Sequence, residues 1–181
     1  MNFKSLSPPE KWIILSIPIL FILGSLMHFL YDFTGNITLV GLISPVNESI
    51  WEHLKLVLLP IILFWFIYYF LNGKKYNINK EKWFLGCVIS LVFSMLTILA
   101  FNYTYTQAFG IQWLPLDIFN LFLSITVGQF MGLHFYRYSE GVRVFTSLLI
   151  LILILGIFIL FTISPPHIPL FRDATTGQFG I

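Results

Sequence analysis

The sequence predicts an all-α integral membrane protein with about five transmembrane helices. Its 181 residues are 57% hydrophobic and 10% charged, and its mean hydropathy is +0.87. Soluble domains carry roughly 45–50% apolar and about 25% charged residues, so this composition excludes a soluble enzyme and a disordered chain. The net charge of +2 is too small to indicate a nucleic-acid partner. The apolar runs are long and continuous, which favours helices over the short alternating segments of a membrane β-barrel.

Five apolar segments are long enough to cross a bilayer, which takes about 20 helical residues. We expect the spans at residues 12–30, 50–71, 83–102, 113–135 and 144–163, within one polytopic domain that covers residues 1–181. Tryptophans stand at the start of four of these segments, where indole rings favour the membrane interface. The apolar stretch 37–45 is too short to span, and it predicts a re-entrant or interfacial segment between the first two helices.

The distribution of basic residues predicts the orientation of the chain. Of the ten lysines and arginines, only Lys55 and Arg172 fall on the side opposite the N-terminus. By the positive-inside rule, the N-terminus is cytoplasmic and the C-terminal tail is extracytoplasmic. The residue usage, rich in Ile, Phe, Lys and Asn, is typical of an AT-rich bacterium. We therefore expect a multi-pass protein of the bacterial cytoplasmic membrane.

Ionisable and amide side chains gather at the predicted outer ends of four spans. Helical spacing places His28 and Asp32 on one stripe, and it does the same for Glu48 and Glu52. Such groups inside a bilayer usually face the interior of the bundle and mark a functional site. The predicted metal ligands are His28, Asp32, His53 and His167; the predicted catalytic bases are Glu48 and Glu52; the predicted substrate-binding residues are Lys55, Asp117, Asn120 and Arg172.

Imidazole and carboxylate are the ligands that zinc prefers among these residue types, and two ligands one helical turn apart can converge on one ion. The cluster therefore predicts zinc or another divalent metal as a cofactor, although the chain contains no H-E-x-x-H motif. A metal-free hydrogen-bonded network is the alternative. Ser49 and Glu52 fit a capping box, and Lys55 fits either an ion pair with Glu52 or a side chain that reaches the surface.

Three segments carry a resemblance to a known family. The run SPVNESIWEHLKL at residues 44–56 resembles the signature of an uncharacterised family of small bacterial multi-span membrane proteins. The segment HFLYD at residues 28–32 and the tail from Pro165 to the final Gly-Gln-Phe-Gly-Ile are similar to other marked segments of that family. The resemblance implies a compact multi-span fold that brings these polar segments together, and it implies no particular activity.

Three functions fit these patterns. The first is a membrane-embedded, metal-dependent hydrolase that acts on an amphipathic substrate, lipid-like or a membrane peptide, at the outer face. The second is a substrate-binding or transport component that holds a small solute and requires a partner membrane subunit. The third is an accessory membrane protein, for which the stripe of Ser90, Ser94 and Thr97 suits close helix packing or a homo-oligomer. Membrane lipids are expected partners in all three cases.

Overall fold

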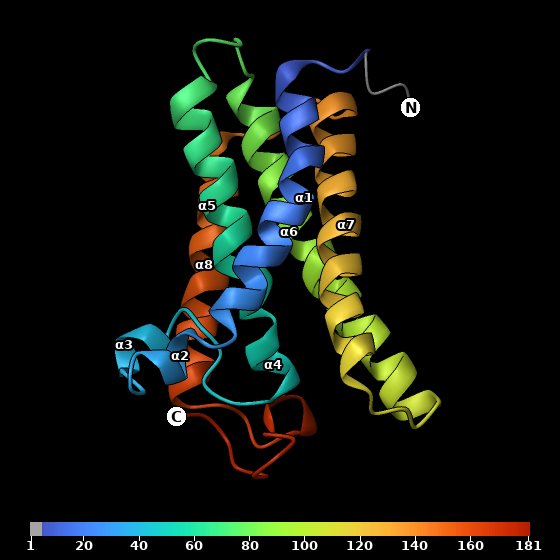
Figure 1. The fold of residues 1–181 in the computed structure, drawn as a ribbon. Helices are drawn as coiled ribbons and strands as arrows, with labels where there is room; N and C mark the ends of the chain where they lie inside the picture. Colours follow the sequence, from blue (N-terminus) through green and yellow to red (C-terminus); the bar gives the residue numbers. More distant parts are fainter. Residues whose placement is uncertain (1–4) are drawn as a thin grey trace.

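The computed structural model describes residues 5–181, and its long elements are all helices. Within this part of the chain, five helices are long and apolar enough to cross a membrane, as the sequence predicts. They are α1 (Pro8–Met27), α4 and α5 in succession (Ile50–His53 and Lys55–Asn72), α6 (Lys80–Tyr103), α7 (Leu114–Tyr138) and α8 (Val144–Ile163). Figure 1 shows that α1 begins at one end of the bundle, while the tail after α8 lies at the opposite end. We call these ends the N-terminal face and the site face.

The first helix begins and ends earlier than the hydropathy pattern predicts. Pro8 and Pro9 occupy its first turn, where a missing N–H breaks no helical bond. Ser7 and Glu10 form a capping box, with the Ser7 N–H donating to Glu10 Oε2 at 2.6 Å. The helix ends at Met27, so His28 is its C-cap residue rather than part of a continuous helix that also includes Asp32. Because α1 ends here, His28 and Asp32 do not lie one turn apart on the same helix, although the sequence predicts that they do.

Helix α6 lies at the centre of the bundle and packs most closely against α7. A Cβ atom on Gly128 would lie 2.0 Å from Ser94 Oγ, and one on Gly132 would lie 2.8 Å from the Gly86 carbonyl oxygen. Glycine and serine at these positions let the two backbones approach, which is the usual device of membrane helix pairs. Ser90 and Ser94 are both fully buried in this part of the bundle. The serine stripe of the third span therefore serves helix packing within the chain.

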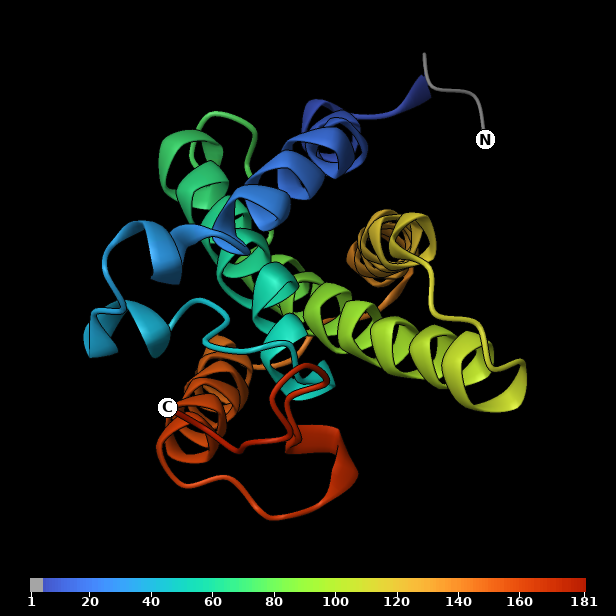
Figure 2. The same cartoon turned by 60° about the horizontal axis from the view of Figure 1, so that its bottom comes forward.

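Two segments cover the site face beside the long helices. The connection between α1 and α4 contains the one-turn helices α2 (Leu30–Phe33) and α3 (Thr38–Gly41). The tail contains a 3₁₀ turn, η3 (Pro169–Phe171), followed by an isolated antiparallel bridge between Arg172 and Phe179. Figure 2 shows both segments on the side of α5 and α8, away from the splayed ends of α6 and α7. The stretch that we expect to be re-entrant or interfacial thus lies beside the spans as one turn of helix flanked by loops.

Aromatic and backbone contacts hold these covering segments in place. The Trp51 ring stacks on Phe158 of α8, with the ring centroids 4.4 Å apart, and lies 4.7 Å from the ring of Phe171 in the tail. Asn47 Nδ2 donates to the Gly180 carbonyl oxygen at 3.2 Å. The start of α4, the end of α8 and the tail therefore form one packed unit, on which the loop that precedes α4 rests.

Candidate metal centre

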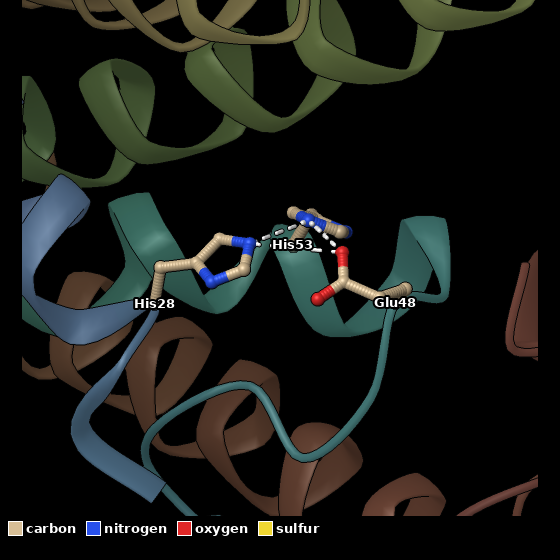
Figure 3. A group of neighbouring side chains, drawn as sticks. All are labelled: His28, Glu48 and His53. Carbon is tan, nitrogen blue, oxygen red and sulfur yellow. Dashed lines mark hydrogen bonds and ion pairs between the residues drawn. The ribbon is translucent and has the colours of Figure 1, made fainter. Parts of the chain in front are cut away.

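Three side chains from separate parts of the chain converge at the site face. His28 follows the last residue of α1, Glu48 lies in the loop before α4, and His53 is the last residue of α4. His53 Nε2 lies 3.3 Å from Glu48 Oε2 and 3.3 Å from His28 Nε2, while His28 Nε2 lies 3.7 Å from Glu48 Oε2 (Figure 3). Among the described residues, this is the group whose ligand atoms are close enough together to hold one metal ion.

The spacing of these three atoms matches three corners of a coordination tetrahedron. With ligands at about 2.0–2.1 Å from zinc, the corners of a regular tetrahedron are about 3.3–3.4 Å apart. Two of the three observed separations have that length and the third is slightly longer. The side chains of His28, Glu48 and His53 are 31%, 44% and 29% exposed. All three side chains are therefore partly accessible to water.

A backbone hydrogen bond orients the His53 ring. Its Nδ1 lies 2.9 Å from the Ser49 carbonyl oxygen, which can only accept, so Nδ1 carries the proton. In the neutral imidazole the lone pair then lies on Nε2, which is 3.3 Å from Glu48 Oε2. Two acceptors 3.3 Å apart require either a proton or a cation between them. His53 thus has the outer-shell backbone hydrogen bond that is typical of metal-binding histidines.

The electrostatics of the group couple His28 to Glu48. The Glu48 carboxylate, whose Oε2 lies 3.7 Å from His28 Nε2, and the negative charge of Asp32 raise the pKa of His28 above its ordinary value despite partial burial. The close contacts of Glu48 with His28 and His53 hold the pKa of its carboxyl well below its usual range. Without a metal, the carboxylate therefore stays ionised and attracts a positive charge, which a protonated histidine or a divalent cation supplies.

A buried ion pair lies beneath this group. Lys55 is fully buried, and its Nζ donates to Glu52 Oε2 at 2.6 Å and to the carbonyl oxygens of Gly41 and Ser44 at 2.7 and 3.2 Å. An ammonium has three N–H donors, so all of its hydrogen-bonding capacity is used. The pair fixes the loop between α3 and α4 to the start of α5. Lys55 therefore has no donor left for a substrate, which revises the role predicted from the sequence.

Glu52 is likewise saturated by contacts within the protein. Its Oε2 also accepts from the Val46 N–H at 3.0 Å, and its Oε1 accepts from the Thr162 hydroxyl of α8 at 3.2 Å. The side chain is 3% exposed. Of the expected capping box, the Glu52 N–H does donate to Ser49 Oγ, but the carboxylate turns toward Lys55 instead of the Ser49 amide. The predicted role of Glu52 as a catalytic base does not fit these contacts, and we assign it to the scaffold that positions Glu48 and His53.

Close backbone approaches allow the elements of the site to meet. A Cβ atom on Gly24 would lie 2.7 Å from the Leu56 carbonyl oxygen, so glycine lets the last turn of α1 approach α5. His28 follows one turn later and reaches His53, with the ring centroids 5.2 Å apart. A Cβ atom on Gly41 would similarly lie 2.5 Å from Val46 Cγ1. The absence of side chains at Gly24 and Gly41 thus positions the ligands.

The structure separates Asp32 from the three converging ligands. Because α1 ends at Met27 and α2 begins at Leu30, helical spacing does not hold between His28 and Asp32. The exposed Asp32 carboxylate accepts from Asn36 Nδ2 at 3.1 Å, and its charge contributes to the raised pKa of His28. Asp32 is therefore a neighbour of the site but not one of the grouped ligands.

The remaining predicted site residues lie elsewhere on the site face. His167 is in the tail, with its ring centroid 4.7 Å from that of Phe179, and Arg172 is exposed in the same segment. On the far side, Asp117 of α7 accepts a hydrogen bond from the Tyr105 hydroxyl, and Asn120 Nδ2 donates to the Ile98 carbonyl oxygen at 3.1 Å. These contacts join α7 to α6. The structure does not bring His167, Arg172, Asp117 or Asn120 into the group of His28, Glu48 and His53.

Sequence reasoning missed two partners of the polar residues. Thr162 contacts Glu52 from α8, and Tyr105 contacts Asp117 from the π-helical turn η2 (Thr104–Ala108) that extends α6. Neither residue stands out in an apolar run, because threonine and tyrosine are common in membrane helices. Their partners are also 110 and 12 residues away in the sequence, beyond the reach of helical spacing. The signal that comes closest is the Ser164-Pro-Pro sequence, which indicates that α8 ends just after Thr162.

The comparison with known families identifies the chain only at the level of a family. A model described as a family of unknown function, DUF6512, matches residues 1–181. The chain belongs to the DUF6512 family. It matches no curated protein and no solved structure. Membership in DUF6512 agrees with the resemblance to an uncharacterised family and assigns no chemistry, so the function of this DUF6512 protein has to be argued from the site itself.

Proposed function

We propose that this protein is a membrane-embedded, metal-dependent hydrolase whose divalent metal, zinc being the best fit, is bound by His28, Glu48 and His53. The observation that carries the proposal is the spacing of the three ligand atoms, 3.3, 3.3 and 3.7 Å, on side chains that are all partly exposed to water. Two histidines and one glutamate are also the protein ligands of well-known catalytic zinc sites. A metal in such a site polarises a bound water and lowers its pKa toward neutrality.

The proposal requires a group that accepts a proton from the attacking water. Glu48 is engaged as a ligand and Glu52 is buried in an ion pair, so neither is free for this task. Asp32 is exposed, lies outside the ligand group and is close enough for its charge to act on His28. We assign the role of proton acceptor to Asp32, since a catalytic carboxylate must be near the metal without occupying it.

The surroundings of the ligands favour an amphipathic substrate. Large apolar side chains of the connection between α1 and α4 are strongly exposed beside His28, with Phe29 at 66% and Phe33 at 89%. Exposed apolar surface at the end of a membrane span suits the boundary between lipid headgroups and acyl chains. A lipid-like ester or a membrane peptide would reach the metal there without leaving the bilayer. We place the site face on the extracytoplasmic side of a bacterial cell membrane, following the distribution of basic residues.

Zinc content of protein purified in detergent without a histidine tag tests the metal site. We expect about one zinc per wild-type chain, and a large loss of zinc in His28→Ala and Glu48→Ala. His167→Ala removes a histidine from the same face outside the group and serves as the matched control, with wild-type zinc content expected. Wild-type protein that stays metal-free when zinc is offered would leave the three residues as a hydrogen-bonded network and overturn the proposal.

Hydrolysis is tested separately on zinc-loaded protein with fluorogenic carboxylate and phosphate esters that carry acyl chains. We expect Asp32→Asn to lose turnover by about 10²-fold or more while its zinc content is unchanged, the size of effect that general-base groups supply. Zinc binding without turnover of any ester would retain the metal site but refute the hydrolase. Turnover that is unchanged in Asp32→Asn would refute the role of Asp32 alone.

A further inference from the structure

A polar cavity that is open to solvent lies at the N-terminal face, at the opposite end of the bundle from the proposed metal centre. It has a volume of about 390 Å³ and lies between the start of α1, the connection from α5 to α6, and the end of α7. Its polar lining includes Glu10, Asn77, Asn79, Lys82, Tyr136 and Arg137. The volume is within the range of small-molecule sites, roughly 300–1,000 Å³. Most of the lining residues carry hydrogen-bond donors, which suits an anion.

The one carboxylate that lines this cavity is already neutralised. Glu10 Oε1 pairs with Arg137 Nε at 2.7 Å, and Glu10 Oε2 accepts from the Ser7 N–H and hydroxyl at 2.6 and 2.8 Å. Lys82 is different, because its ammonium contacts no carboxylate among residues 5–181 at ion-pair distance. One acidic and two basic side chains therefore leave the cavity with a net positive charge.

The Arg137 side chain is held in position before any ligand binds. The guanidinium is fixed by Glu10 on one side and lies 5.6 Å from the centroid of the Tyr138 ring on the other. A guanidinium held in this way suits the planar, multi-donor recognition of phosphate oxygens. Side-chain entropy is already lost in the free protein, so less is lost on binding.

The cavity lies at the ends of the candidate membrane spans. Helix α1 starts at Pro8 and α7 ends at Tyr138, so the lining residues stand at the ends of the spans rather than in the bilayer core. Three further lysines, Lys74, Lys75 and Lys80, are exposed on the same face. The distribution of basic residues predicts that this face is cytoplasmic, and basic pockets between membrane helices on the cytoplasmic side bind anionic headgroups. We propose that the cavity binds the phosphate of an anionic phospholipid headgroup, with Lys82 and Arg137 as its cationic contacts.

Native mass spectrometry of the detergent-purified protein tests this site, with phosphatidylglycerol and phosphatidylcholine of the same acyl chains offered together. We expect wild type to retain phosphatidylglycerol preferentially. Lys82→Gln should weaken that retention about fivefold, because one cation near an anionic headgroup contributes about 1 kcal/mol. Lys80→Gln removes an exposed lysine of the same helix that does not line the cavity, so it is the matched control for the general charge of this face, with less than a twofold effect expected. Equal thermal stability of the two variants excludes unfolding as the cause.

Excess inorganic phosphate distinguishes the source of the anion. If phosphate displaces phosphatidylglycerol from wild type but has no effect on Lys82→Gln, the cavity recognises the phosphate group itself. If phosphate does not compete while the Lys82 dependence remains, the lipid is the ligand and its acyl chains contribute. Equal retention of the two lipids by wild type, or wild-type retention of phosphatidylglycerol by Lys82→Gln, would overturn the proposal.

Discussion

The buried ion pair of Glu52 and Lys55, next to the proposed metal centre, gives the sharpest prediction about stability. Lys55→Met keeps the length of the side chain and removes its charge. The Glu52 carboxylate would then remain buried with only two donors, the Val46 N–H and the Thr162 hydroxyl, and two loop carbonyl oxygens would lose their donor. Removing one partner of a buried pair costs about 3–5 kcal/mol, since an uncompensated charge is left behind. We expect a loss of that size in the free energy of unfolding.

The double variant Glu52→Gln/Lys55→Met separates the charge pair from the shape of the site. With both charges removed, the loss in the free energy of unfolding should be at least about 1 kcal/mol smaller than the sum of the losses in the two single variants, because the effects of substitutions within one hydrogen-bonded network are not additive. Reversible unfolding in mixed detergent micelles measures all three variants, with the exposed Lys80→Met as control. A Lys55→Met protein within about 0.5 kcal/mol of wild type, the usual range of surface substitutions, would refute the reasoning.

The remaining predictions concern the close approach of α1 to α5, which positions His28, and the effect of pH on His28, Glu48 and zinc binding. Gly24→Val should lower zinc affinity at least tenfold, because its Cβ would lie 2.7 Å from the Leu56 carbonyl oxygen and would push α1 away from α5. Gly156 has open space around its Cβ position, so Gly156→Val is the control and should bind zinc like wild type. Equal zinc affinities of the two variants would contradict the role of the close approach at Gly24. Without metal, the interaction of His28 with Glu48 should stabilise the fold most below the ordinary pKa of histidine, since the pKa of His28 is raised in the folded state, and this stabilisation should be lost as the pH rises through that raised pKa. Because the folded-state pKa of Glu48 is depressed, the same stabilisation should also be lost as the pH falls below the ordinary carboxyl range. Zinc competes with the proton on His28, so the affinity for zinc should fall with falling pH. If the unfolding temperature of metal-free His28→Gln depended on pH as that of wild type does, the result would argue against the pairing of His28 with Glu48.

The helices were predictable because hydropathy over about 20 residues reports directly on burial in lipid. The first and last residues of the helices were less predictable. Helix α1 begins at two prolines and ends before His28, and both limits depend on local backbone chemistry that hydropathy does not report. This break is also why Asp32 separates from His28, although their spacing in the sequence indicates one helical face.

The site was predictable only in part, for a similar reason. The run that contains Glu48 and His53 marks polar groups at the start of a span, and the structure brings these two residues together with His28, also a predicted ligand. Which carboxylate faces the ligands and which faces the core depends on the loop carbonyls that bind Lys55. Those contacts form only once the connection between α1 and α4 folds over α5, which local sequence does not specify. The polar stripe of Asp117 and Asn120 likewise finds its partners on α6.

The proposal that His28, Glu48 and His53 bind one metal ion can be tested with a crystal structure of zinc-soaked protein, using data collected at the zinc absorption edge. We predict one strong anomalous peak at about 2.0–2.2 Å from His28 Nε2, His53 Nε2 and Glu48 Oε2, with a water as the fourth ligand. An ordered site with no anomalous peak between these three atoms, at a zinc concentration that populates sites elsewhere on the protein, would contradict the claim.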